Sequence, residues 1–287
     1  MNYRHGYHAG NFADVVKHVA LAAILAHLKK KDTAFSVIDS HAGRGLYDLA
    51  GMEAQRTGEA QGGIARFRDL TGEMPGALSS YLSLVKDAGD NAYPGSPLIA
   101  AKLLRSQDRL TAIEKHPEEF AALKDALAPF RNAAAENADG YARALKLLPP
   151  PSRRGLTLID PPFESPQEFS DLAQTVREAH RKFATGIYLL WYPIKSEAEA
   201  NAFTGEVLAG GIAKAIAIST KVPAPEGKLN CAGLLVINPP YGFAAEMQRA
   251  AGLLAPRLDG EITLTLTGFF GPQIGFRHWD RITPSQT

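Results

Sequence analysis

Residues 34–45 read AFSVIDSHAGRG, an apolar run that ends in an acid and enters a turn containing two glycines. This pattern is typical of a strand buried in a parallel sheet. Similar apolar runs recur along the chain, at 109–117, 155–160, 184–193, 212–220, 231–240 and 260–270. Segments with helical character separate most of them, at 117–130, 166–183, 196–211 and 242–258. Because strand alternates with helix, we expect an α/β fold with a doubly wound, mostly parallel, Rossmann-like sheet. The last run is expected to be an edge strand or a hairpin partner.

Two further segments complete the expected organisation. Residues 12–30 predict a helix with one broad apolar face, begun by a capping pair of Asn11 and Asp14. Residues 47–93 show no clear strand, and we interpret them as a mainly helical insertion after the first strand of a single domain spanning 1–287. Ser96 is expected to cap the next helix, with Pro97 at its first position.

Composition limits the classes of protein. The chain has 287 residues, 45% of them apolar and 21% charged, which is ordinary for a globular protein. Its one cysteine, Cys231, excludes an intrachain disulfide, and no Cys/His cluster has zinc spacing, so no metal is expected. The sequence has neither a signal-like segment nor an apolar run of membrane-spanning length, which predicts a soluble, cytoplasmic protein without membrane contact.

Charge is nearly balanced, with a net value of +1, which argues against a wide basic surface. Locally, residues 1–31 carry five cations against the single acid Asp14. Three of these cations, Lys29 to Lys31, are interpreted as capping the C-terminus of the first helix. Other basic side chains fit either phosphate contacts or solvated surface, namely Arg4, His5, Lys17, Arg153 and Arg154.

Polar residues follow the expected strands at the edge where an open parallel sheet binds ligands. Gly43 and Gly45 follow the first strand, and Glu114 ends the second, where an acid suits a ribose diol. The third glycine of the dinucleotide fingerprint is missing, which disfavours a pyrophosphate cofactor. A nucleoside such as S-adenosylmethionine fits better, although two glycines also fit a simple structural turn.

The sequence Asp160-Pro161-Pro162-Phe163 has a specific chemical logic at the end of the strand 155–160. The exocyclic amine of adenine is a poor nucleophile because its lone pair is delocalised into the ring. The Asp160 carboxylate and the Pro161 carbonyl can accept its two hydrogens, while Phe163 offers a ring for stacking the base. The plain alternative is that the prolines end a strand and Phe163 fills a core.

A second sequence of this type, Asn238-Pro239-Pro240-Tyr241, follows a late strand. Strands this far along a nucleotide-binding sheet usually lie away from the ligand crevice. We therefore predict that Asn238 has a structural role and that Asp160 carries the chemistry.

These residues resemble a known family. Class I methyltransferases acting on an adenine or glutamine nitrogen carry (Asp/Asn/Ser)-Pro-Pro-(Tyr/Phe/Trp) after their fourth strand. The strings NYRHGYHAGNFADVVKH, DSHAGRGLYDL, RTGEAQGGIAR, YPGSPLIA, ADGYARAL, SRRGLTLIDPPFE and FATGIYLLWYP resemble more narrowly the bacterial RlmJ family, the 23S ribosomal RNA adenine-N6 methyltransferases. The resemblance extends from residue 2 to about residue 240.

The resemblance implies a set of site residues. The S-adenosylmethionine pocket would be formed by His18, His41, Ser96, Glu114, Asp139, Gly140 and Asp160. Asp160 would also accept the target proton, and Tyr3 would lie near the target base. Phe163 stands where the family often has tyrosine, which retains stacking but removes a hydroxyl. From the residues alone, a buried core histidine is the preferred interpretation of His18.

The implied activity is transfer of a methyl group from S-adenosylmethionine to N6 of a 23S rRNA adenine, adenine-2030 in the family. We expect the base to be flipped out onto Phe163, and the RNA to be a protein-free or early-assembly hairpin. Few phosphate contacts, a shallow salt dependence and a monomeric protein are also expected. Three alternatives remain open: a DNA adenine-N6 methyltransferase, a protein glutamine-N5 methyltransferase acting through Asn238, and a non-catalytic RNA-binding module.

Overall fold

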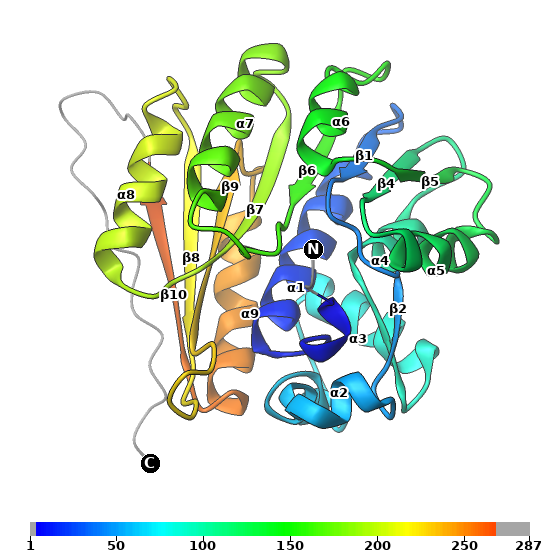
Figure 1. Cartoon of the computed structure of the whole chain (residues 1–287), viewed down its shortest axis with the longest axis vertical. Coiled ribbons are helices and arrows are strands. Elements are labelled where there is room, and N and C mark those ends of the chain that lie inside the picture. The colour runs from blue at the N-terminus through cyan, green and yellow to red at the C-terminus, as the bar shows by residue number, and fades with distance from the viewer. Residues whose placement is uncertain (1–3, 268–287) are drawn as a thin grey trace.

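The structure, a computed structural model, describes residues 4–267 and contains an eight-stranded sheet in the order β10-β8-β9-β7-β6-β1-β4-β5 (Figure 1). Strands β5, β4, β1, β6 and β7 are parallel, whereas β9 is antiparallel to both β7 and β8, and β10 is antiparallel to β8. The strands are β1 (Ser36–Asp39), β4 (Arg109–Glu114), β5 (Ala133–Asn137), β6 (Gly155–Ile159), β7 (Ile187–Pro193), β8 (Ala215–Lys221), β9 (Cys231–Ile237) and β10 (Glu261–Thr267). The Rossmann-like, mostly parallel sheet is confirmed, with β10 as an edge strand.

Helices cover both faces of the sheet and form two cores. One core gathers apolar side chains of α1, α3, α4, α5 and α9, and the other those of α6, α7 and α8. The helices are α1 (Phe12–Leu28), α2 (Met52–Thr57), α3 (Gly76–Ala88), α4 (Ser96–Leu103), α5 (Pro117–Leu127), α6 (Gly140–Lys146), α7 (Glu168–Lys182), α8 (Glu197–Leu208) and α9 (Phe243–Arg257). Within residues 4–267, none of these helices has the length and apolar character needed to cross a bilayer.

Helix α1 is buried on nearly all sides, and the expected single apolar face is wrong. It packs against α3, α4 and α9, so even the charged Asp14 and Lys17 are almost fully covered. The expected cap is confirmed, because the Asn11 side chain accepts a hydrogen bond from the Asp14 amide at 2.9 Å. The helix therefore begins where the sequence indicates, but it lies inside the protein.

The segment 47–93 contains α2, α3 and two short 3-10 helices, Glu59–Gly62 and Ile64–Phe67. The sequence suggested that this segment has no strand, and that prediction is wrong. Strand β2 (Leu46–Asp48) pairs antiparallel with β3 (Ala92–Pro94), opposing the buried Tyr47 and Tyr93. Three-residue strands are too short to show alternation, which explains why the sequence pattern missed them.

Two other local expectations need correction. Ser96 is the first helical residue of α4 and makes no capping hydrogen bond; Gly95 occupies the cap position. Strand β5 escaped prediction because its sequence, AAAEN, lacks the β-branched and aromatic residues typical of strands. With β5 counted, β6 is the fourth parallel strand along the chain, and Asp160 follows directly after it.

Candidate functional site

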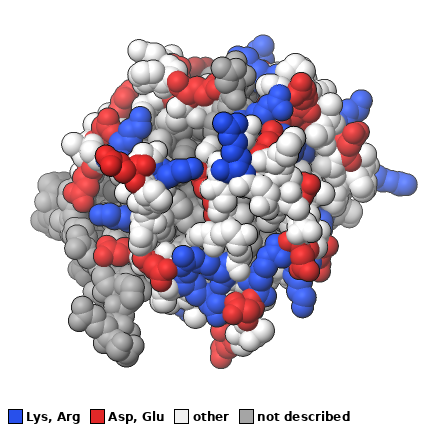
Figure 2. Space-filling model, turned by 60° about the horizontal axis from the view of Figure 1, so that its bottom comes forward, with Lys and Arg blue, Asp and Glu red and all other residues white. Residues whose placement is uncertain are grey.

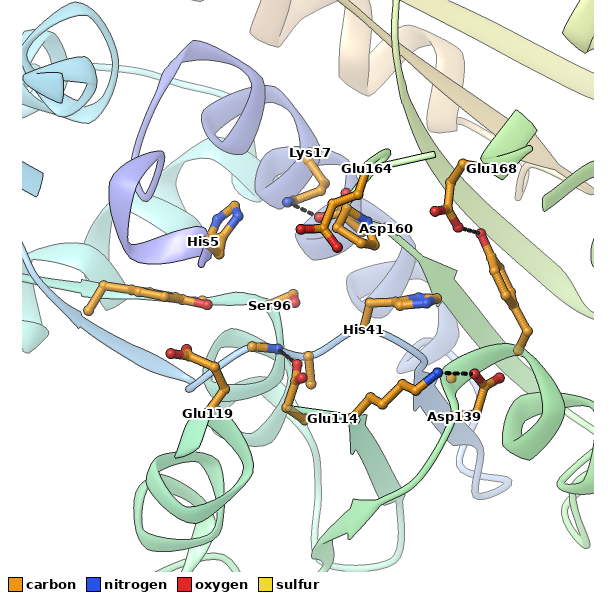
Figure 3. A pocket seen from close by; sticks show the side chains of 18 of the residues that line it. His5, Lys17, His41, Ser96, Glu114, Glu119, Asp139, Asp160, Glu164 and Glu168 are labelled. Atoms are coloured by element: carbon orange, nitrogen blue, oxygen red, sulfur yellow. Dashed lines mark hydrogen bonds and ion pairs between the residues drawn. The ribbon is translucent and has the colours of Figure 1, made fainter. Parts of the chain in front are cut away.

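A cavity of about 370 Å³ lies beyond the carboxyl ends of β1, β4 and β6, with side chains from several elements pointing into it (Figure 3). Such an edge is where ligands bind to open parallel sheets. Seven residues that the resemblance implied for the donor pocket all line this cavity: His18, His41, Ser96, Glu114, Asp139, Gly140 and Asp160. Tyr3 lies outside the described residues.

The chain backbone closes tightly around one end of the cavity. At Gly140 a Cβ atom would lie 2.1 Å from the Ser40 carbonyl oxygen and 2.9 Å from His41 Nε2. At Gly43 the φ angle is +61°, which side chains rarely adopt, and a Cβ would lie 2.0 Å from the Tyr47 hydroxyl. Glycine is therefore required at both positions, and the cavity wall there is backbone.

Glu114 ends β4 with its carboxylate fixed in place. Its Oε2 accepts a hydrogen bond from the Gly43 amide at 2.9 Å, and its Oε1 accepts one from the His116 amide at 2.7 Å. Burial raises the pKa of Glu114 above its usual value, although these two amide bonds oppose the shift. The carboxylate retains lone pairs for the hydroxyls of a ribose.

His41 and His18 are both neutral. Burial lowers the pKa of His41 to about 4 and that of His18 to about 3. The Ser40 hydroxyl donates to the Leu158 carbonyl at 3.1 Å, so His41 Nδ1–H donates to Ser40 Oγ at 2.8 Å and Nε2 is left as an acceptor. His18 Nδ1 bonds the Tyr93 hydroxyl at 2.7 Å, so this histidine is both a core residue and part of the cavity lining.

Asp39, at the end of β1, is buried directly behind the cavity. Its Oδ2 accepts a hydrogen bond from the Ser96 hydroxyl at 2.7 Å, which is the role that Ser96 plays instead of capping. Burial, with a smaller contribution from nearby Asp160, raises the pKa of Asp39 to about 7, although the Ser96 bond opposes the shift. The carboxyl group is therefore half protonated near neutral pH.

Asp139 caps helix α6 and also faces the cavity. Its Oδ1 accepts a hydrogen bond from the Ala142 amide at 3.1 Å, while its Oδ2 pairs with Lys115 at 3.1 Å. Its side chain is about half exposed. One carboxylate thus fixes the start of α6, beside the tight approach at Gly140, and presents an acceptor to a ligand.

Lys17 is the site residue that sequence reasoning missed, because phosphate contact or solvated surface had been expected for it. Its ammonium group is buried and pairs with both Asp160 and Asp14 Oδ1, the latter at 2.7 Å (Figure 3). Burial lowers the pKa of Lys17, but the two carboxylates outweigh it and hold the pKa above its usual value. The sequence did hold one signal for this role. Lys17 follows the acid Asp14 by three residues in a helix that is otherwise largely apolar.

Other basic residues near the site are also paired. The second Asp14 oxygen accepts from the Gly10 amide and contacts His5 Nε2, both at 2.9 Å. Arg4 pairs with Glu118 at 2.7 Å. His5 is thus held against a buried carboxylate, whereas Arg4 is an exposed surface side chain with an acidic partner.

The Asp160-Pro-Pro-Phe163 loop divides between the cavity and an aromatic cluster. Asp160, Pro162 and Glu164 line the cavity, whereas Pro161 and Phe163 are not part of its lining. The Phe163 ring packs on Phe169 at 4.7 Å and on Trp191 at 5.7 Å between centroids. The backbone of Phe163 has a φ of +48°, so the loop turns sharply after the prolines.

Asn238 lies at the opposite edge of the sheet, since the end of β9 pairs with the start of β7. Its side-chain amide donates to the carbonyls of Ala184 and Gly186, at 2.8 and 2.7 Å. This agrees with the structural role predicted for it. The two Pro-Pro sequences are therefore separated by the full height of the sheet.

The residues present fit a nucleoside-type methyl donor. His18 Nε2 and Asp39 Oδ1 are buried polar atoms without a partner among the described residues, which is unusual unless a ligand or water satisfies them. Of these two, His18 lines the cavity, and together with Glu114, Asp139 and the acceptor on His41 it gives the cavity polar groups for a ribose, an adenine edge and a charged amino acid. No cluster of metal-binding side chains occurs in the described part of the chain.

Comparisons with known proteins agree with this geometry. Residues 32–265 match the family described as "Ribosomal RNA large subunit methyltransferase D, RlmJ". Two proteins named "Ribosomal RNA large subunit methyltransferase J" are similar: that of Escherichia coli is 39% identical, covering 90% of this chain and 94% of the relative, and that of Haemophilus influenzae is 36% identical, covering 92% and 96%. A crystal structure of the Legionella pneumophila protein LPL1258 superposes with a TM-score of 0.84 at 33% identity, covering 93% of this chain and 99% of that one.

A methyltransferase with this fold takes its methyl group from S-adenosylmethionine, and the cavity fits that donor. The expected family and class of enzyme are confirmed. The chain belongs to the RlmJ family of ribosomal RNA large subunit methyltransferases.

Proposed function

We propose that the protein methylates N6 of a specific adenine of 23S rRNA, adenine-2030, using S-adenosylmethionine. The observation that carries this proposal is the position of Asp160. Its carboxylate ends the fourth parallel strand, lines the same cavity as Glu114 and Gly140, and is held by the buried Lys17. A hydrogen-bond acceptor at the mouth of a donor pocket is what methylation of an amino group requires.

The strand ends bind the donor. Glu114 would accept the ribose hydroxyls, and Asp139 and His41 would contact the adenine end, beside the backbone wall at Gly140. The neutral His18 offers its unpartnered Nε2 to a polar group of the donor. When bound, S-adenosylmethionine supplies an electrophilic methyl group on sulfonium.

The target amine is activated by hydrogen-bond acceptors. The Asp160 carboxylate and the Pro161 carbonyl accept the two N6 hydrogens, which frees the nitrogen lone pair for attack. Asp160 then takes the proton that N6 loses after transfer. Lys17 fixes the direction of the carboxylate, since its ammonium group lies between Asp160 and Asp14.

Phe163 would support the flipped base. Its ring packs against Phe169 and Trp191, which fix its position, so the base would stack on an immobilised ring. Tyr3 would approach the base from the N-terminus. Stacking on an aromatic side chain is worth about 1–3 kcal/mol per base, enough to hold an unpaired adenine.

The face that carries the cavity favours recognition of RNA shape. Lys/Arg and Asp/Glu are interspersed over much of this face, although several cations gather in its lower part (Figure 2). Arg4, Arg44 and Lys115, which lie around the cavity, all pair with acids. Few phosphate contacts around the target therefore suit a small, protein-free or early-assembly rRNA hairpin, bound by a monomer.

Methyl incorporation tests the proposal. The wild-type protein should methylate protein-free 23S rRNA and leave duplex DNA unmodified, and Asp160→Ala should lower the rate about 10²–10⁴-fold. Asn238→Ala is the matched control, since it removes the polar side chain from the other Pro-Pro sequence. Transfer to DNA alone would contradict the RNA substrate.

The protein glutamine alternative requires Asn238 at an active centre. Both hydrogens of its side-chain amide are already donated to backbone carbonyls, at the edge away from the cavity. Loss of activity in a folded Asn238→Ala variant, with full activity in Asp160→Ala, would establish that alternative. Absence of a thermal shift with S-adenosylmethionine would favour a non-catalytic RNA-binding module.

A further inference from the structure

A group of basic side chains lies at the edge of the sheet opposite the cavity, where the parallel strands begin. We name it the amino-edge cluster; it consists of Lys29, Lys30, Lys31, Arg105, Arg109, Arg153 and Arg154. They come from the segment after α1 and the segments leading into β4 and β6. The blue loop after α1 and the green loop before β6 both stand at the top of Figure 1.

Two arginines of the cluster hold the loop together. Arg154 donates to the carbonyls of Leu28 and Thr33, at 2.5 and 2.6 Å. Arg105 donates to the Lys31 carbonyl at 2.9 Å and pairs with the buried Asp108 at 2.9 Å. Arg154 thus satisfies the last carbonyl of α1, and Arg105 holds the turn that follows it. Lys29 is the C-cap residue of α1, so the expectation that lysines cap this end is confirmed for Lys29.

Arg109 donates to the carbonyls of Ser106 and Asp108, whereas three other cations of the cluster have no partner among the described residues. Lys30, Lys31 and Arg153 are exposed, and no ion pair or side-chain hydrogen bond of theirs exists among residues 4–267. The acids near these cations are Asp32 and Asp108, and Asp108 already forms an ion pair with Arg105. The excess of positive charge also acts on His27, whose pKa is lowered by burial first and then by Lys30. Most cations around the cavity, by contrast, have carboxylate partners.

An exposed aromatic ring stands beside the cluster. Tyr241 is 94% exposed, and its backbone lies within hydrogen-bonding reach of the His27 ring. The turn that presents it is held in place, because Asn238 bonds the segment just before β7, two prolines follow, and Phe243 is buried at the start of α9. The second Pro-Pro sequence, which lies away from the cavity, thus exposes the Tyr241 ring to solvent next to unpaired cations.

We infer that the amino-edge cluster and Tyr241 form a second RNA-binding surface, which contacts an rRNA segment other than the one entering the cavity. Free ammonium and guanidinium groups would neutralise backbone phosphates, and an unstacked base would lie on the Tyr241 ring. The inference rests on the proposed function, since it takes rRNA as the ligand.

The distance between the two surfaces requires separate RNA segments. Lys17 contacts Asp160 from α1, and Lys29 follows it by 12 residues, which is about 18 Å along a helix. One flipped nucleotide spans much less, so the cluster would hold a neighbouring helix or loop. An anionic membrane is the less suitable partner. Among the described residues the other exposed large apolar side chains, Leu46 and Met52, lie in the insertion and give the cluster no apolar surface to insert.

Binding of a labelled 23S rRNA fragment, measured against salt concentration, tests the inference. The triple variant Lys30→Gln/Lys31→Gln/Arg153→Gln should bind at least about five-fold more weakly at 0.1 M salt and reduce the slope of log K against log salt by about 2, since each lost phosphate contact removes about 0.7–0.9. A matched variant, Lys86→Gln/Lys124→Gln/Lys221→Gln, removes the same charge from exposed positions elsewhere and should change binding less than two-fold.

A second pair of variants isolates the ring. Tyr241→Ser should weaken binding about five-fold or more, whereas Tyr241→Phe retains stacking and should bind like the wild type. Methylation of a minimal target hairpin should be unchanged in all these variants, because it does not reach the cluster.

Distinct outcomes separate this inference from the proposed function. Equal salt slopes for the two triple variants, with rRNA methylation intact, would overturn the second surface and leave the activity standing. Binding to phosphatidylglycerol vesicles that depends on the cluster, with unchanged RNA binding, would assign the surface to a membrane instead. Failure of the wild type to methylate any rRNA would overturn the proposed function itself.

Discussion

Lys17 decides how the acceptor Asp160 is presented to the substrate. Its ammonium group is almost fully buried and has two carboxylate partners, Asp14 and Asp160. A buried charge network of this kind is rarely the most stable arrangement, but removal of one member leaves the others unpaired. The lysine is therefore best understood as a positioning residue that fixes the direction of the Asp160 carboxylate.

Replacement of Lys17 by methionine should destabilise the protein by about 3–5 kcal/mol, because Asp14 and Asp160 would lose their counter-ion in a buried site. Methyl transfer should fall with it, even at temperatures where the variant is folded. Urea unfolding at pH 7 measures the first effect. The control Lys30→Met changes an exposed lysine and should remain within about 0.5 kcal/mol of the wild type. Equal stability of the two variants would contradict the buried network.

Asp39 predicts a dependence of stability on pH. Its pKa is raised to about 7 by burial, so between about pH 4 and 7 the folded protein binds more protons than the unfolded chain. The contribution of Asp39 to the free energy of unfolding should therefore fall as pH rises through this window, by at most about 4 kcal/mol. In Asp39→Asn this fall should be absent, which denaturation curves at pH 5, 6, 7 and 8 would reveal. Parallel pH profiles for both proteins would contradict the raised pKa.

At the residue scale, the sequence pattern itself located the groups at the ends of the predicted strands. Glu114 ends β4 and Asp160 follows β6, so topology alone places them at one edge, whereas Asp139 and His18 were assigned to the site through the family resemblance. Lys17 reaches the site from α1, and its burial depends on how α3, α4 and α9 pack around that helix. No local pattern encodes such packing.

Helix α1 is the element on which the site depends, since it is the central helix of one core and carries Lys17 and His18. Most of its residues are buried, Ile24 among the completely covered ones. Its position explains why the sequence predicted the helix and its cap correctly but misjudged its surroundings. An apolar face is a property of the local sequence, whereas burial on all sides comes from the insertion and from α9.

Truncation of Ile24 to alanine should cost about 2–5 kcal/mol of unfolding free energy, because it opens a cavity in the core around α1. Met52→Ala removes a side chain that is 91% exposed and should cost less than about 0.5 kcal/mol. Thermal or urea unfolding of the two variants measures the contrast. A small effect at Ile24 would mean that α1 is less central than the structure shows.

The strands were also predicted only where the local sequence pattern is clear. Longer apolar runs identified β1, β4, β6, β7, β8, β9 and β10, while β5, made largely of alanine, and the three-residue β2 and β3 were missed. The two Pro-Pro turns differ in their polar residue, and the direction of the strand before each one sets where that residue lies. Strand β6 runs toward the cavity and β9 runs away from it, which gives Asp160 a chemical position and Asn238 a structural one.

At the scale of the molecule, the small net charge conceals an uneven distribution. Arg4, Arg44 and Lys115 around the cavity pair with acids. At the amino edge Lys30, Lys31 and Arg153 have no such partner among the described residues. Composition alone predicted neither, because it counts charges without their partners.

The wild-type protein should show a shallow dependence of rRNA affinity on salt, with a slope of magnitude about 2–4, since only a few free cations are available for phosphate contacts. Filter binding of a 23S rRNA fragment between 50 and 300 mM KCl measures it. A slope of magnitude near 8 would indicate a far wider phosphate interface than either face provides.

The central claim is methylation of an rRNA adenine through Asp160, and mapping of the modified nucleotide tests it most directly. Unmodified 23S rRNA would be incubated with S-adenosylmethionine and either the wild-type protein or Asp160→Ala, digested, and analysed by mass spectrometry. We expect a single N6-methyladenine, at adenine-2030, with the wild type and almost none with the variant. Methylation of another atom or base, or equal methylation by Asp160→Ala, would contradict it.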